Sequence, residues 1–308
     1  MINGIPFSRF ARELYGEISE DDIFNGAAAL AYWLTLAIFP AMIFVMAIIP
    51  YLPLADVDTA IMDLLRQLLP DSAAGMFADV VSEVTGEERG GLLSFGFLAT
   101  LWATSSGMSA VMQQLNVTYD VKESRGTVRV RLTAMGLSVL FGVLVVTSFS
   151  LIVLGGTAQE WLGERYGFSN ALLDFFMLFR WALILLSLLL GFALVYYLAP
   201  DVKQKFVFIT PGSVVGVAVL IAASLGFKLY ATNFGHYDAT YGSVGAVIVL
   251  MLWLYIAGLV LLLGSEVNAL VEHHTPEGKL KGEKAPGESG QGPQASRQPP
   301  PSGHAGAK

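Results

Sequence analysis

The sequence predicts an all-α polytopic membrane protein, and three observations support that prediction. The 308-residue chain is 54% hydrophobic and only 14% charged, its mean hydropathy is +0.60, and its charges are spaced so that long apolar intervals remain between them. Soluble domains carry about 25% charged residues, and a soluble fold of this size could not hide so much apolar surface. The composition therefore argues against a soluble enzyme and against a disordered chain.

Six charge-free intervals predict six transmembrane helices. A charge near the centre of a bilayer costs at least ~2.5–3.5 kcal/mol, and each interval can house the ~20-residue apolar helix that crosses the hydrocarbon. In the second interval, residues 103–107 (Ala-Thr-Ser-Ser-Gly) are polar or small, so a broken or re-entrant helix is an open alternative there. We expect the spans near residues 27–50, 92–115, 132–155, 177–199, 209–231 and 244–267.

The distribution of Lys and Arg predicts the orientation. With six crossings, most of these residues fall on the side that holds both termini, and the positive-inside rule makes that side cytoplasmic. The first apolar run is longer than the hydrophobic region of a cleavable signal, and no small-residue cleavage site follows it. We expect a multi-pass protein of the bacterial cytoplasmic (inner) membrane with both termini in the cytoplasm.

The connecting segments divide the chain into three parts. Residues 1–22 are expected to form a cytoplasmic segment with an amphipathic helix over 5–18, followed by a capping box at residues 19–22 that begins the first span. Residues 23–272 form the six-span domain, and its outer loop, 56–89, carries two apolar stripes typical of short amphipathic helices. Residues 273–308 are rich in Pro and Gly, which predicts a disordered cytoplasmic tail.

Polar residues near the predicted span ends are the candidate lining of a cavity or substrate path. Those after the fifth span are also typical of an aromatic belt with a turn, and an acid at the end of the sixth span could simply reach water. Small residues four apart, such as Gly212 and Gly216, favour close helix packing. The candidate lining residues are Asn116, Asn233, Tyr237, Asp238, Glu266 and Asn268.

The inner loop 120–131 is basic. Each cation near an anionic membrane surface is worth about 1 kcal/mol, so this loop is a candidate site for lipid head groups. The alternative is that its cations serve only as a topology signal. The cations are Lys122, Arg125, Arg129 and Arg131.

No catalytic, metal or cofactor site is predicted. Cysteine is absent and only four His exist, of which His273 and His274 are adjacent, and neighbours on a helix point in different directions. The chain has no HExxH, GxSxG or GxxxxGK motif. A net charge of −7 argues against nucleic acid as a partner. The expected partners are membrane lipids and a lipid-like substrate, and the oligomeric state is not predicted.

Short motifs occur along the chain, namely AAALAY at 27–32, FP at 39–40, LW at 101–102, LNVTYD at 115–120, PG at 211–212, FKLY at 227–230, NF at 233–234, YGS at 241–243, WLY at 253–255 and GSEVN at 264–268. Together these stretches resemble the YihY/BrkB family of bacterial inner-membrane proteins over most of residues 8–272. One departure is residues 32–37, where the family often carries more polar side chains and this chain retains Thr35. The resemblance implies a six-helix membrane fold without a settled biochemical activity, in which a ribonuclease BN label is generally regarded as mistaken and envelope-lipid transport has been proposed.

Three functions compete at this stage. The leading hypothesis is a transporter or flippase for an amphiphilic, lipid-like envelope substrate. The alternative is a non-transporting membrane scaffold that binds partners through its outer helices or its tail. Ribonuclease activity is the third and is disfavoured, because nuclease chemistry needs clustered carboxylates or histidines that this sequence does not show.

Overall fold

The structure is a computed structural model that describes residues 6–48, 90–166, 170–234, 243–275 and 278–287. Over these residues it is all α-helical, with no strand. The expected outer helices of 56–89, together with Tyr237 and Asp238, lie outside the described residues. The helices are α1 (Phe7–Glu20), α2 (Ile23–Ile48), α5 (Gly90–Thr118), α6 (Thr127–Tyr166), α7 (Asn170–Leu198), α8 (Pro211–Phe234) and α10 (Ser243–His273).

Each of the six expected intervals coincides with one long helix. Four of these helices contain a stretch long and apolar enough to cross a membrane, namely Ile23–Ala41, Thr127–Ser148, Leu172–Leu198 and Val247–His273. The apolar part of α8, Pro211–Phe227, is shorter. The all-helical fold with four candidate membrane spans agrees with the expectation, and the count of six crossings stays a prediction.

The second interval forms one continuous helix, α5, and its polar residues do not break it. Thr104 Oγ1 donates to the carbonyl of Thr100 at 2.7 Å. Ser106 and Ser109 donate in the same way to Trp102 and Ser105, both at 2.8 Å. Hydroxyls that bond back to the preceding turn are satisfied within their own helix, so α5 tolerates them in an apolar environment.

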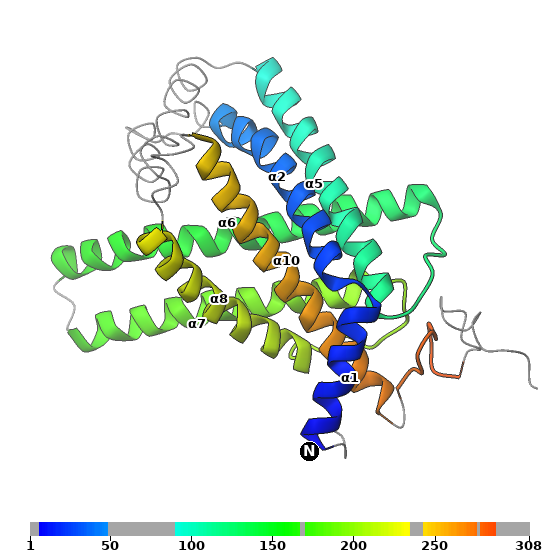
Figure 1. Ribbon diagram of the computed structural model, residues 1–308. Helices are drawn as coiled ribbons and strands as arrows, with labels where there is room; N and C mark the ends of the chain where they lie inside the picture. The colour runs from blue at the N-terminus through cyan, green and yellow to red at the C-terminus, as the bar shows by residue number, and fades with distance from the viewer. Residues whose placement is uncertain (1–5, 49–89, 167–169, 235–242, 276–277, 288–308) are drawn as a thin grey trace, which may run out of the picture.

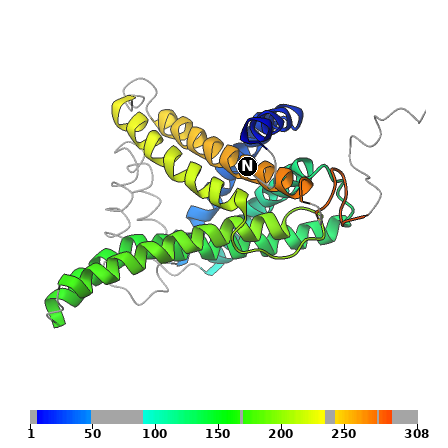
Figure 2. The same cartoon turned by 90° about the horizontal axis from the view of Figure 1, so that it is seen from below.

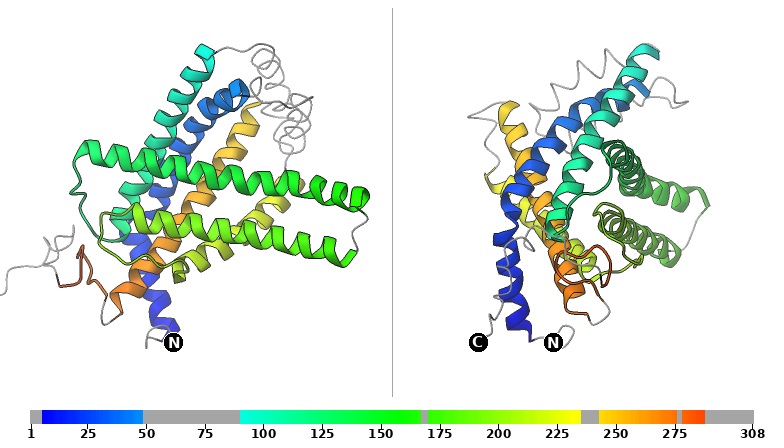
Figure 3. Two further views of the ribbon diagram at one scale, coloured as in Figure 1. Left: turned by 180° about the vertical axis from the view of Figure 1, so that it is seen from behind. Right: turned by 90° about the vertical axis from the view of Figure 1, so that its right-hand side faces the viewer.

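The helices do not form a simple parallel bundle. Helix α2 packs against α5 and α10, and α10 also packs against α8. Helices α6 and α7 form a long antiparallel pair that lies across the other helices (Figures 1 and 2) and contacts them through α5 and α8. The rear and side views show the same pair on one side of the molecule, with α1 projecting at one end (Figure 3).

The buried core lies where α2, α5, α7 and α10 meet. Leu30, Met112, Leu115 and Leu262 are at most 1% exposed. Large apolar side chains elsewhere on the helices stay uncovered, for example Leu178 at 69%. Lipid tails are as apolar as these side chains, so such faces are suited to a bilayer.

Helices α8 and α10 cross at two glycines. A Cβ added to Gly212 would overlap the carbonyl of Gly264, and one added to Gly264 would overlap the Tyr196 hydroxyl. That hydroxyl donates to the carbonyl of Leu261 at 2.8 Å. Small residues thus bring two backbones together, as the Gly212–Gly216 spacing predicts.

The N-terminal helix agrees with the expectation, but the predicted capping box is wrong. Helix α1 is amphipathic, with Phe10 buried and Phe7 and Tyr15 exposed. It runs through Ser19 to Glu20, so Ser19 does not begin α2. The corner is instead made by Asp22 in the left-handed region, at φ 51, a conformation that Asp tolerates better than most residues.

Part of the segment expected to be a disordered tail packs against the helices. We call residues 278–287 the strap. Lys279 and Glu283 are buried, and the lysines of the strap pair with carboxylates on α10, on α1 and in the loop before α8. In the sequence these lysines look like solvated charges of a tail, and the partners of Lys281 and Lys284 lie far away along the chain. Residues 288–308 lie outside the described part.

Candidate functional site: the charged end

Charged residues from five segments gather at one end of the helices, which we call the charged end. It comprises α1, the α5–α6 loop, the α7–α8 loop, the last turns of α10 and the strap. Lys281 connects three of these segments, with its Nζ 2.7 Å from Glu17, 3.5 Å from Asp120 and 3.6 Å from Glu20. This position raises the pKa of Lys281, because the surrounding carboxylates outweigh the effect of burial.

The turn after α5 directs Asp120 toward this end. Asp120 adopts φ 53, and the backbone N–H groups of Asp120 and Val121 donate to the carbonyls of Val117 and Asn116 at 2.8 and 2.9 Å. This is a Schellman motif with Asp in the place usually taken by glycine. Burial raises the pKa of Asp120 to about 6, although Lys281 acts in the opposite direction.

A second group of contacts, the loop junction, ties the α5–α6 loop to the α7–α8 loop. Arg125 donates to both oxygens of Glu123, at 2.8 and 2.7 Å, and to the carbonyl of Ala199 at 2.8 Å. Asp201 accepts from the backbone N–H and the hydroxyl of Ser124, at 2.8 and 2.6 Å, and pairs with Lys284 of the strap at 2.5 Å.

The acids of the loop junction are held ionised. Burial alone would raise the pKa of Asp201, but hydrogen bonds from Lys284 and Ser124 outweigh it and lower the pKa to about 2. Burial has the same opposing effect on Glu123, and hydrogen bonds from Arg125 lower its pKa below the usual value. The loop junction is therefore a stable ion network.

The third group of contacts, the carboxyl cluster, lies beside Lys281 and contains Asp21, Asp120 and Glu266. Glu266 is 1% exposed, and its side chain is hydrogen-bonded to that of Asp21. Burial raises the pKa of Asp21, and the nearby charges of Asp120 and Glu17 raise it further. Within this cluster, Asp120 lies 3.5 Å from the ammonium group of Lys281, whose charge also acts on Asp21.

A cavity of about 680 Å³ opens beside the carboxyl cluster, between the ends of α7, α8 and α10, the α7–α8 loop and the strap. Lys203, Gln204 and Lys205 supply polar groups from the loop, and Ala193 and Val271 are among its apolar walls. Asn268 also lines it and accepts from the Gly212 N–H at 2.7 Å. The volume lies within the ~300–1,000 Å³ typical of ligand sites.

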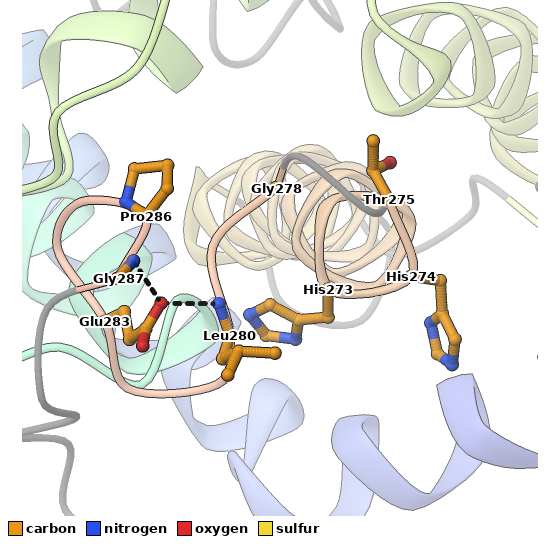
Figure 4. A pocket seen from close by; sticks show the side chains of 8 residues that line it. All are labelled: His273, His274, Thr275, Gly278, Leu280, Glu283, Pro286 and Gly287. Carbon is orange, nitrogen blue, oxygen red and sulfur yellow. Dashed lines mark hydrogen bonds between the residues drawn. The ribbon is translucent and has the colours of Figure 1, made fainter.

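A smaller cavity, of about 460 Å³, lies between the end of α10 and the strap. His273 and His274 point in different directions there, and Glu283 accepts from the N–H groups of Leu280 and Gly287 at 3.0 and 3.3 Å (Figure 4). His274 Nε2 lies 3.2 Å from Glu13. Among the described residues, no group of three His, Asp or Glu side chains is arranged to hold a metal ion.

The structure separates the candidate lining residues. Asn116 belongs to the loop junction, where it donates to Glu123 at 3.0 Å and accepts from the Asp201 N–H at 2.7 Å. Glu266 belongs to the carboxyl cluster, and Asn268 lines the larger cavity. The side chain of Asn233 lies outside the described part, as do Tyr237 and Asp238.

The four cations of the inner loop also have different surroundings. Arg125 belongs to the loop junction, and its side chain is only 10% exposed. Arg131 lies over the Trp102 ring, 4.1 Å from its centroid, and donates to Ser106 at 3.2 Å. Lys122 and Arg129 are exposed. Of the four cations predicted to contact lipid head groups, Lys122 and Arg129 are therefore the most exposed.

Sequence reasoning missed Asp21, Asp201, Lys281 and Lys284 as parts of one site. The only local signal was the adjacent acids Glu20, Asp21 and Asp22 just before an apolar helix. Nothing local marks the two lysines, because their partners come from other segments.

These features define a helical membrane protein in which the polar contacts of the described residues are concentrated at the charged end. The chain belongs to the virulence factor BrkB family, whose model matches residues 14–288 and so includes the strap. This confirms the family that the sequence motifs indicate and extends the match beyond residue 272.

Named relatives agree with membership of a membrane-protein family. The chain is 35% identical over 262 residues to the Bacillus subtilis (strain 168) protein YfkH, whose name describes it as ribonuclease-like; the match covers 85% of this chain and 94% of the relative. It is 26% identical over 282 residues to a UPF0761 membrane protein of Aeromonas salmonicida (strain A449), covering 87% and 90%. Another UPF0761 membrane protein, VV0203 of Vibrio vulnificus (strain YJ016), is 26% identical over 281 residues, covering 87% and 84%. No solved structure matches the chain.

Proposed function

We propose that the protein moves an amphiphilic, lipid-like substrate with an anionic head group across the cytoplasmic membrane. The observation that supports this proposal is the cavity of about 680 Å³ at the charged end. It combines the cations Lys203 and Lys205 with apolar walls on helices that expose apolar faces. An amphiphile with an anionic head group needs both the cations and the apolar walls, since its head group binds to cations and its chains pack against apolar surfaces.

The orientation follows the charge distribution. The charged end carries the strap lysines and the basic loop 120–131, and an excess of such residues is typical of the cytoplasmic side. The cavity would then receive substrate from the inner leaflet. Lys122 and Arg129 are exposed near this end and would contact anionic head groups of the surrounding bilayer.

The test is a transfer assay in liposomes. Purified protein is reconstituted with fluorescent lipids whose head groups are neutral or anionic, and a membrane-impermeant quencher reports which leaflet they occupy. We expect protein-dependent transfer of anionic lipids. If none of the head groups moves faster with protein than in empty liposomes, the proposal is wrong.

Matched variants locate the site. The double variant Lys203→Ala/Lys205→Ala removes two cations from the cavity, worth about 1 kcal/mol each, and should weaken substrate binding roughly 30-fold. The control Lys122→Ala/Arg129→Ala removes the same charge from an exposed place outside the cavity. Equal effects of the two pairs would argue against the cavity as the substrate site.

A membrane scaffold without transport is the second candidate. The observation that favours it is the exposure of Phe7 and Tyr15 on α1, at 70% and 76%, which a partner protein or the membrane surface could cover. A scaffold would retain a stable partner in pull-down experiments while showing no transfer in the liposome assay.

A further inference from the structure

Glu266 and Asp21 bring two carboxyl groups into contact where α10 meets the α1–α2 corner. Their side chains are hydrogen-bonded to each other. Glu266 is 1% exposed, and neither its Oε1 nor Oδ2 of Asp21 has a hydrogen bond from a donor in the described part of the protein. An ionised carboxylate only accepts, so a hydrogen bond between two carboxyls requires a proton on one of them.

The surrounding charges make this proton necessary. Glu17 and Glu20 face the pair from α1 and Asp120 from the end of α5, while the strap contributes Lys281. Further along α10, Glu272 is paired with Lys279 and His273 lies near Lys281 and Lys279. On α2, Asn25 donates to Asp22 at the corner. Lys281 forms its ion pairs with Glu17, Glu20 and Asp120, and among the described residues no cation forms an ion pair with Asp21 or Glu266.

The contacts of Lys281 couple the pair to the strap. Lys281 binds the strap to α1 through Glu17, and α1 continues into the corner that holds Asp21. Gly278 and Pro286 of the strap line the larger cavity. If both carboxyls of the pair were ionised, they would repel each other across a buried contact. The corner would then separate from α10 and strain the contact between Glu17 and Lys281 of the strap.

We propose that Glu266 and Asp21 bind one proton between them, and that loss of this proton releases α1 from α10. Glu266, the more buried partner, holds the proton and donates it to Asp21. The inference of a proton site depends only on the contact between the two carboxyl groups. Its use in transport, as an opening of the cavity beneath the strap, rests on the proposed function.

The proton is tested directly by infrared spectroscopy on the full-length protein in detergent. At about pH 8 an ordinary carboxyl is ionised, and Asp120, with its pKa of about 6, is ionised too. The wild type should still show the C=O stretch of a protonated carboxylic acid, and Glu266→Gln should lose it. The control Asp174→Asn alters an exposed carboxyl on α7 and should leave the band unchanged. A band that persists in Glu266→Gln overturns the proposal.

The release is tested by a distance measurement. The chain contains no cysteine, so Tyr15→Cys on α1 and Val128→Cys on α6, at positions 76% and 74% exposed, give a unique pair of spin labels. Raising the pH from about 8, where the proton is still bound, to about 10.5 should lengthen the distance in otherwise wild-type and Asp174→Asn protein. Glu266→Gln, whose amide can donate to Asp21 at every pH, should keep the short distance.

A second substitution covers the case in which Glu266→Gln does not fold. Asp21→Asn removes the charge from the other side of the pair and should also abolish the dependence on pH. The proposal is contradicted if the distance in the wild type does not change with pH. It is also contradicted if a folded Glu266→Gln or Asp21→Asn variant shows the same change of distance as the wild type. Neither measurement uses a lipid substrate, so a negative transfer assay with positive results here would refute transport and leave the proton site in place.

Discussion

Replacing Arg125 by methionine should destabilise the protein by an amount that its contacts allow us to estimate. The guanidinium makes two hydrogen bonds to Glu123 and one to the carbonyl of Ala199, and the side chain is 10% exposed. Removing one partner of a fully buried ion pair costs about 3–5 kcal/mol. Glu123 is 28% exposed and can regain water, so we expect a loss of about 2–3 kcal/mol.

The assay is thermal unfolding in detergent, followed by tryptophan fluorescence. A loss of this size should lower the unfolding midpoint by roughly 5 °C or more. The unfolding midpoint of Arg125→Lys should lie between those of the wild type and Arg125→Met, because lysine keeps the charge but cannot reproduce the bidentate contact with Glu123. The matched control is Arg129→Met, an exposed cation of the same loop, which should change stability by no more than about 0.5 kcal/mol.

Two results would refute the reasoning. If Arg125→Met unfolds at the wild-type temperature, the loop junction does not stabilise the fold. If it binds anionic liposomes more weakly while its stability is unchanged, Arg125 acts on lipid head groups, as its position in a basic loop indicates, and not on Glu123.

Three further predictions concern packing, acid stability and the strap. Gly212→Val should sharply reduce the folded yield, since the valine side chain would meet the backbone of α10. Gly226→Val should be tolerated, because no atom lies within 4 Å of a Cβ added there. Size-exclusion profiles of the two variants test the difference. The pKa of Asp201 is about 2 in the fold and about 3.9 when unfolded, so its carboxylate stabilises the protein above about pH 4 and loses that effect as the pH falls toward 2. The thermal unfolding midpoint of Asp201→Asn should therefore fall less on acidification than that of the wild type. A chain ended at Gly287 keeps the strap contacts and should unfold like the full chain, while one ended at Thr275 loses three strap lysines and should unfold at a lower temperature.

The long helices were predictable because one physical constraint dominates them. Charges are excluded from hydrocarbon, so the gaps between charges locate α2, α6, α7 and α10, although α6 continues to Tyr166, well beyond the expected end of its span at residue 155. The continuity of α5 was not predictable from composition. It depends on whether Thr104, Ser106 and Ser109 bond back to their own helix, which sequence alone leaves open.

The charged end was only partly predictable. Glu266 and Asn268 stood out because a polar residue near a span end is uncommon, and both are buried in the structure. Lys281 and Lys284 did not stand out, since a lysine in a Gly- and Pro-rich segment usually lies in water. Their roles depend on Glu17 and Asp201, which no local pattern connects to the strap.

The position of the strap in the chain has a consequence for biosynthesis. Glu17 and its partner Lys281 are 264 residues apart, so a ribosome must synthesise the chain from α1 through α10 before that pair can form. Until then α1, the α5–α6 loop and the α7–α8 loop present carboxylates without their final lysine partners. The helices can enter the bilayer one after another, but the last step of maturation is the docking of this short segment after α10.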